Sequence, residues 1–173
     1  RRGRHRRHGA PRIDAHAIAV SSGRVSMGDA SADTPVAGLN LTSSLLSSLS
    51  ELTELTVRSY STIDLYGSLV LGNIEADGKL RLDSLHLDSW GLVGHGVGNK
   101  LLQAASVNLT NLNQAACATA CAGDGSGSLT ILALNGDAPN SGRLFIGEGE
   151  KHIEGFSSVN IQAWKDIVAT GDG

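Results

Sequence analysis

The sequence predicts an all-β protein: a right-handed parallel β-helix, or β-solenoid, with one short helix near residues 43–50. The main observation is a plan shared by residues 54–67 (ELTVRSYSTIDLYG) and 84–96 (SLHLDSWGLVGHG). In both, alternating apolar residues, a short polar bend and a second apolar pair end at glycine. Alternation with a period of two is typical of a strand with one buried face. Because one such unit cannot bury its apolar face alone, we expect stacked units with like residues in ladders about 4.8 Å apart.

The spacing inside the unit supports stacking. The same plan recurs at 13–28 and 156–173, and the step from the first strand to the second is 5 or 6 residues in all four units. A solenoid fixes such a bend through its cross-section, while its outward loops vary freely. Leu65→Asp should therefore prevent folding, whereas Asp64→Leu next to it should not. We expect the inward ladder to contain Ile63, Leu65, Leu87, Leu92, Val159 and Ile161.

A leucine pattern interrupts the strands. Leu45, Leu49 and Leu52 stand at helical spacing, which predicts a short helix around residues 43–50 with Thr42 or Ser43 as its N-cap. Its serines make it a weak helix, so it needs to pack against the β core.

A β-sandwich is the alternative fold, because it also contains many short strands. The pairs Asp77–Gly78 and Asn135–Gly136 would suit its hairpin turns.

Charge divides the chain into a basic arm, residues 1–12, and a β-solenoid segment, residues 13–173. The arm holds six of the 14 basic residues, which leaves 8 basic against 17 acidic residues, a net charge of −9, in the rest. We expect the arm to be disordered and solvated, and an acidic body gives no footprint for nucleic acid.

No apolar run approaches the roughly 20 residues of a membrane helix. Because the chain begins with Arg and has no hydrophobic leader, we interpret it as a fragment or a processed piece.

Three runs resemble the filamentous haemagglutinin family of large secreted proteins: RSYSTIDLYGSLVLG (58–72), LDSWGLVGHG (87–96) and IGEGEKHIEGFSSVNIQAWKDIVATGDG (146–173). The resemblance covers most of residues 13–173. It implies a long right-handed β-helical shaft at the bacterial cell surface, exported by a partner outer-membrane transporter in two-partner secretion. It also implies a role in adhesion, aggregation or contact-dependent antagonism. The implied partners are a host or bacterial surface receptor or glycan and the neighbouring coils of a parent chain.

The sequence departs from that family in three respects. It has no Asn-Pro-Asn-Leu motif of the secretion domain and no Arg-Gly-Asp motif, so the resemblance implies shaft and not export signal. Its Cys-Ala-Thr-Ala-Cys run, residues 117–121, is unexpected in a cysteine-poor shaft. Cys117 and Cys121 could form a disulfide outside the cell, but their spacing does not decide whether they do.

The titratable residues predict no catalytic, cofactor or metal site. No two histidines stand at the spacing of a metal site; His86 should point outward from a strand and His95 should lie in a turn. The histidines are His5, His8, His16, His86, His95 and His152.

A polysaccharide-cleaving β-helix enzyme is the alternative function, and an inert fragment is the third. Such an enzyme would gather carboxylates and a basic residue in one outer groove. The candidates are Asp64, Asp83, Asp88 and Asp166 with Arg81 or Lys165. We expect these carboxylates to be solvated and to face outward.

Overall fold

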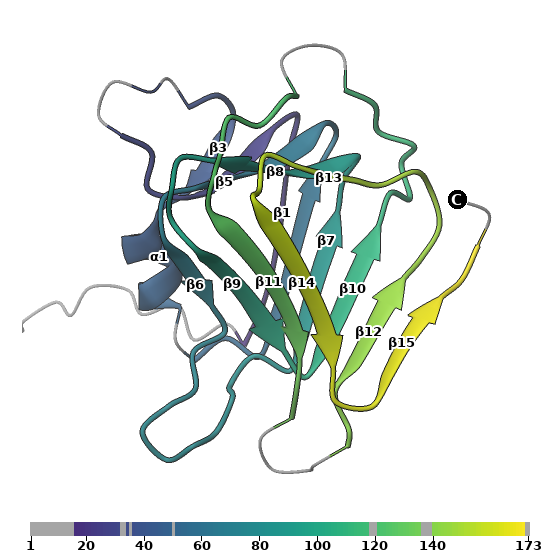
Figure 1. The fold of residues 1–173 in the computed structure, drawn as a ribbon. Coiled ribbons are helices and arrows are strands. Elements are labelled where there is room, and N and C mark those ends of the chain that lie inside the picture. The colour runs from purple at the N-terminus through teal and green to yellow at the C-terminus, as the bar shows by residue number, and fades with distance from the viewer. Residues whose placement is uncertain are drawn as a thin grey trace, which may run out of the picture.

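The structure is a computed structural model that describes residues 16–31, 34, 36–49, 51–117, 121–135 and 140–171. The basic arm, residues 1–12, lies outside the described residues. Within them the chain forms three sheets whose strands all pair in parallel, and one short helix (Figure 1). The all-β prediction is confirmed. No helix in these ranges is long and apolar enough to span a membrane.

The strands of each sheet lie side by side in a fixed order. Sheet A runs β1 (Ala17–Ser22), β4 (Glu54–Ser59), β7 (Ser84–Asp88), β10 (Ser106–Thr110), β12 (Arg143–Ile146), β15 (Asp166–Ala169). Sheet B runs β3 (Leu39–Leu41), β2 (Val25–Gly28), β5 (Thr62–Tyr66), β8 (Gly91–His95), β13 (His152–Glu154). Sheet C runs β6 (Leu69–Leu71), β9 (Lys100–Ala104), β11 (Ser128–Ala133), β14 (Ser158–Ala163).

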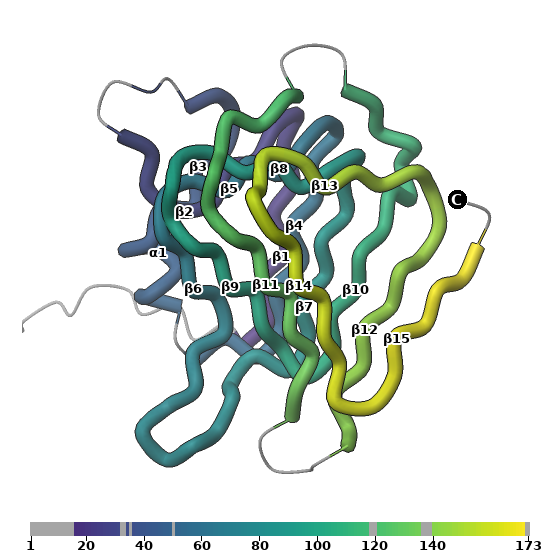
Figure 2. Tube along the Cα trace, viewed as in Figure 1, coloured from purple at the N-terminus to yellow at the C-terminus, as the bar shows by residue number. Residues whose placement is uncertain are grey.

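The chain visits the sheets in turn, as the trace in Figure 2 shows. It passes from A to B to C through β4, β5 and β6, again through β7, β8 and β9, and again through β12, β13 and β14. Between β10 and β11 it omits sheet B, so β13 pairs directly with β8. Residues 111–117 and 121–127, which lie between β10 and β11 in the chain, belong to no strand of the three sheets.

Alternation decides which side chains fill the space between the sheets. In sheet A, Leu55, Leu85, Val107 and Leu144 hold successive register positions, and none is more than 2% exposed. Such a row removes apolar surface from water at about 25 cal/mol per Å². The packing of one strand therefore depends on the strand on each side of it.

Four of the six predicted ladder residues are buried: Ile63, Leu65, Leu87 and Leu92. Val159 stands at the same inward register position as Leu129, as predicted, but it is 44% exposed. Ile161 is only partly buried against the core. Both lie in β14, the last strand of sheet C, where no further strand covers their side chains.

The helix α1 (Ser43–Ser48) confirms the predicted element and its cap, because the Thr42 side chain accepts a hydrogen bond from the Leu45 amide. Its predicted face is wrong at one position. Leu46 is buried, while Leu45 is 42% exposed. The helix lies beside β6, the first strand of sheet C (Figure 1). It therefore covers the edge where sheet C begins.

The antiparallel hairpins of a β-sandwich are not present among the described strands. One isolated antiparallel bridge, outside the named strands, joins Ile74 to Leu80 around the predicted turn at Asp77–Gly78. Residues 80–82 contribute only to that bridge, through Leu80. The turn at Asn135–Gly136 falls partly outside the described residues.

Candidate functional site

Charged side chains gather on the outer face of sheet B. We call Arg24, Asp64, Tyr66, His95 and Asp124 the B-face cluster. Ile63 and Leu65 point inward from β5, so Asp64 between them points outward. Tyr66 and His95 are register partners on β5 and β8. Arg24 directly precedes β2, and Asp124 comes from the segment between β10 and β11.

Asp64 is the centre of the cluster and is 1% exposed. Arg24 donates to it twice, from Nε to Oδ2 at 2.6 Å and from Nη2 to Oδ1 at 2.9 Å. The Thr62 hydroxyl donates at 3.1 Å. Burial opposes ionisation of this carboxyl, but the hydrogen bonds from Arg24, His95 and Thr62 outweigh burial and lower its pKa to about 2.

His95 joins the two carboxylates of the cluster. Its Nε2 lies 3.0 Å from Asp64 Oδ1, and its Nδ1 lies 2.9 Å from Asp124 Oδ1. Ionised carboxylates only accept hydrogen bonds, so both ring nitrogens can donate only when the imidazole carries two protons. The hydrogen bond to Asp64, against the opposing effect of burial, and the bond to Asp124 raise the pKa of His95. The geometry therefore favours an imidazolium.

Tyr66 completes the cluster by stacking on His95. The ring centroids are 4.5 Å apart and the planes are 11° from parallel. Beside them is a cavity of about 290 Å³, which Ser26, Val36 and Ala122 also line. Two cationic and two anionic side chains face this space, so the cluster has no net charge while His95 is protonated.

Lys100 is an unexpected charged residue next to the cluster. It holds the inward register position between Leu69 and Leu129 and is 1% exposed. Its Nζ donates to the carbonyl oxygens of His95 at 3.0 Å and Gly98 at 2.8 Å. Burial lowers the pKa of this ammonium, although the charge of Asp124 acts in the opposite direction. Lys100 therefore ties the end of β8 to the start of β9.

A second buried carboxylate, Asp88, holds the beginning of the 111–127 segment. It is 1% exposed and pairs with Arg58 at 2.7 Å. It also accepts hydrogen bonds from the Leu112 amide at 2.9 Å and the Asn113 side chain at 3.2 Å. Burial opposes ionisation, but the hydrogen bond from Arg58 and those from Leu112 and Thr110 lower the pKa of Asp88.

The 111–127 segment has two fastened parts. We call residues 111–117 the outgoing segment and residues 121–127 the return segment. A disulfide joins them through Cys117 and Cys121, which settles the alternatives left open by the spacing. The return segment bonds to the end of β8, with the Gly125 amide 3.1 Å from the Gly94 carbonyl oxygen.

Glycines allow this close approach. A Cβ atom on Gly123 would lie 2.5 Å from the Cα atom of Gly155, and one on Gly94 would overlap Gly155 and Phe156.

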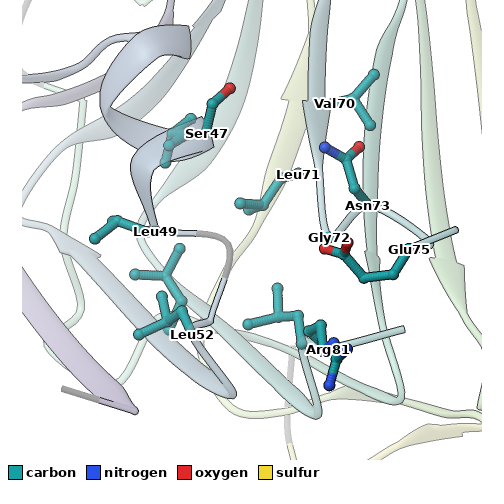
Figure 3. A pocket seen from close by; sticks show the side chains of 12 residues that line it. Ser47, Leu49, Leu52, Val70, Leu71, Gly72, Asn73, Glu75 and Arg81 are labelled. Carbon is teal, nitrogen blue, oxygen red and sulfur yellow. The ribbon is translucent and has the colours of Figure 1, made fainter. Parts of the chain in front are cut away.

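A smaller cleft lies between α1 and β6. Figure 3 shows Leu49, Leu52 and Leu71 around it, with Glu75 and Arg81 at one side. Its volume is about 60 Å³, well below the roughly 300–1,000 Å³ of typical ligand pockets. We interpret it as a packing defect beside the helix.

The carboxylates considered for an enzyme do not meet in one groove. Asp64 and Asp88 are buried in separate ion pairs, so the expectation that they are solvated is wrong. Asp83 is exposed, and Asp166 pairs with Arg143 at 3.4 Å. In each of four cavities lined by described residues, at most one lining residue belongs to the candidate set. Nor do three His, Cys, Asp or Glu side chains of the described chain converge as metal ligands do.

Sequence reasoning missed Arg24, Tyr66, Lys100 and Asp124 as members of a site. One signal was available. Aligning the units 54–67 and 84–96 at their closing glycines puts Tyr66 opposite His95. The position of Asp124 had no comparable signal, because it depends on the path of a loop.

Comparisons with protein-family models, with curated proteins and with solved structures found no match for the chain.

Proposed function

We propose that the three sheets form a right-handed parallel β-helix and that the chain is a shaft segment of a large secreted exoprotein resembling filamentous haemagglutinins. The observation that carries the proposal is the in-register row Leu55, Leu85, Val107 and Leu144 in sheet A. A stack of this kind extends along one axis, because each layer contacts only its neighbours. Its role is to hold binding regions of the exoprotein away from the cell.

Two further observations support export. The resemblance of residues 58–72 to the family's repeat is one. The other is the disulfide between Cys117 and Cys121, since disulfides persist in oxidising compartments and are rare in the cytosol. In this proposal a partner outer-membrane transporter exports the chain, the exoprotein meets a cell-surface receptor or glycan, and the segment itself catalyses no reaction.

Replacing shaft coils tests the proposal. Residues 16–171 would replace a stretch of similar length in a two-partner exoprotein, with an epitope placed after it. Surface labelling of the epitope, protease resistance of the inserted segment and cell–cell aggregation would be measured. We expect display and aggregation at the level of the unaltered exoprotein.

The control is the same graft with Leu65→Asp, which should be exported but digested by protease. If the unaltered graft is digested as fast as the control, or if aggregation is lost while display persists, the chain does not act as a shaft.

A further inference from the structure

The attachment of the return segment, residues 121–127, differs from that of the outgoing segment, residues 111–117. The outgoing segment is held by Asp88, which Arg58 keeps ionised, and by Asn111, whose side chain bonds to both backbone groups of Ala115. The return segment is held by Asp124, which lies 2.9 Å from His95, and by the Ser157 hydroxyl, which donates to the Gly127 carbonyl oxygen at 3.1 Å; of these two contacts the one at His95 is titratable. Histidine is the side chain whose unperturbed pKa lies between pH 5 and 8. The two ends of the segment therefore respond differently to pH near neutrality.

We propose that His95 is a protonation-dependent latch that holds the return segment against β8. When doubly protonated, His95 donates one hydrogen bond to Asp64 and one to Asp124. When neutral, it has one proton and can donate to only one of them. The other carboxylate then faces a nitrogen lone pair, and that contact is lost. This inference does not depend on the proposed shaft function.

The surroundings decide which contact breaks. Asp64 is 1% exposed and cannot be solvated, and Arg24 and Thr62 keep it ionised. Asp124 is 82% exposed and gains water when it is released. The remaining proton therefore stays on Nε2 beside Asp64, and the contact from Nδ1 to Asp124 opens.

The other groups around His95 set the pH at which this occurs. From β5, Tyr66 stacks on the ring, and from the residue before β2, Arg24 adds a positive charge. From β9, Lys100 bonds to the His95 carbonyl oxygen and attracts Asp124. The two carboxylates raise the pKa of His95 above its ordinary value. The latch is therefore closed below the raised pKa of His95 and opens as pH rises through it.

The backbone keeps the opening local. Gly125 and Ser126 donate to the carbonyl oxygens of Gly94 and Gly96, both at 3.1 Å. These bonds are not titratable, so the return segment should loosen and not detach. An exposed ion pair contributes little to stability, which sets the expected effect at roughly a two- to fivefold change in local opening.

Two measurements on the full chain test the latch. The first is an NMR titration of the His95 ring nitrogens. The second is hydrogen exchange of peptides covering residues 121–127 from pH 5 to pH 9, corrected for the chemical exchange rate. We expect His95 to titrate above about 6.5, the ordinary value. Corrected exchange of the return segment should rise about two- to fivefold across that pH, while exchange of residues 111–117 stays constant.

Asp124→Asn is the informative variant, because Asp124 is exposed and its loss should not prevent folding. It should lower the pKa of His95, raise exchange of residues 121–127 at pH 5 and remove the pH dependence. The matched control Asp83→Asn, at another exposed carboxylate, should behave as the parent does. Titration of His95 at or below its ordinary value would overturn the proposal. So would flat exchange in the parent, or an unchanged pH dependence in Asp124→Asn.

Discussion

Val159 follows Leu129 at the same register position of sheet C, yet Leu129 is fully buried and Val159 is 44% exposed. Both side chains point toward the interior, but the strands that carry them have different numbers of neighbouring strands. β11 has a strand on each side, whereas β14 has one. The same holds for Leu144 and Ile167 in sheet A, at 0% and 51% exposure. The last described strands therefore present an apolar, partly uncovered end.

This end predicts self-association. Strand edges with unpaired backbone groups and apolar side chains are templates for pairing. Val159→Lys combined with Ile167→Lys should reduce concentration-dependent association in sedimentation velocity. The control is Val97→Lys, since Val97 is 82% exposed but lies in the corner between sheets B and C. Equal effects from the two changes would show that the uncovered end is not the contact.

The alternation of inward and outward positions predicts that one substitution has very different effects on stability at Leu65 and at Val70. Leu65 is fully buried in β5, whereas Val70 points outward from β6 and is 51% exposed. Leu65→Asp buries an unpaired carboxylate at a cost of several kcal/mol and should abolish cooperative unfolding. Val70→Asp should change stability by less than about 0.5 kcal/mol. Thermal melts followed by circular dichroism would compare them, and a cooperative melt of Leu65→Asp would contradict the assignment of faces.

Asp64 predicts loss of stability in acid. Its pKa, about 2, is below the unfolded value of about 3.9, so the folded state binds this proton less readily. Its contribution of roughly 2–3 kcal/mol is complete above about pH 5, where the carboxyl is ionised in both states, and is lost as pH falls toward 2. Denaturant unfolding from pH 2 to pH 7 would measure this slope.

Asp64→Asn should remove that part of the slope and destabilise the chain at neutral pH, because the buried ion pair between Asp64 and Arg24 is lost. The same reasoning reverses the sequence-based expectation that Asp64→Leu is tolerated. The control Asp83→Asn should keep the slope. A slope that survives in Asp64→Asn would assign the acid effect to other carboxylates.

The glycine contacts predict a steric effect. A Cβ on Gly94 would overlap the Gly155 carbonyl oxygen and the Phe156 ring, whereas a Cβ on Gly23 would meet no atom within 4 Å. Gly94→Ala should therefore cost about 1–3 kcal/mol by overpacking. Gly23→Ala should be neutral or stabilise by up to about 1 kcal/mol, because it restricts the unfolded chain. Equilibrium denaturation of both variants would separate the two effects, and equal stabilities would mean that Gly155 and Phe156 can shift aside.

Alternation within the sequence determined the class of fold and the inward face of most strands. Ile63, Leu65, Leu87 and Leu92 were assigned correctly because side-chain direction in a strand depends only on position along the chain. The helix was also predictable from its leucines and its Thr42 cap. Its buried face was wrong by one residue, since Leu46 and not Leu45 meets the core. The helical pattern leaves the rotation of so short a helix open.

Tertiary structure alone decided which outward residues became buried and what they bind. Asp64 points outward as its neighbours predict, but Arg24, 40 residues earlier in the chain, and His95, 31 residues later, cover it. Lys100 occupies an inward position because the carbonyl oxygens of His95 and Gly98 receive its ammonium. A local pattern fixes the direction of a side chain. Its burial and its pKa depend on segments distant in sequence, which come together only when parallel strands stack in register.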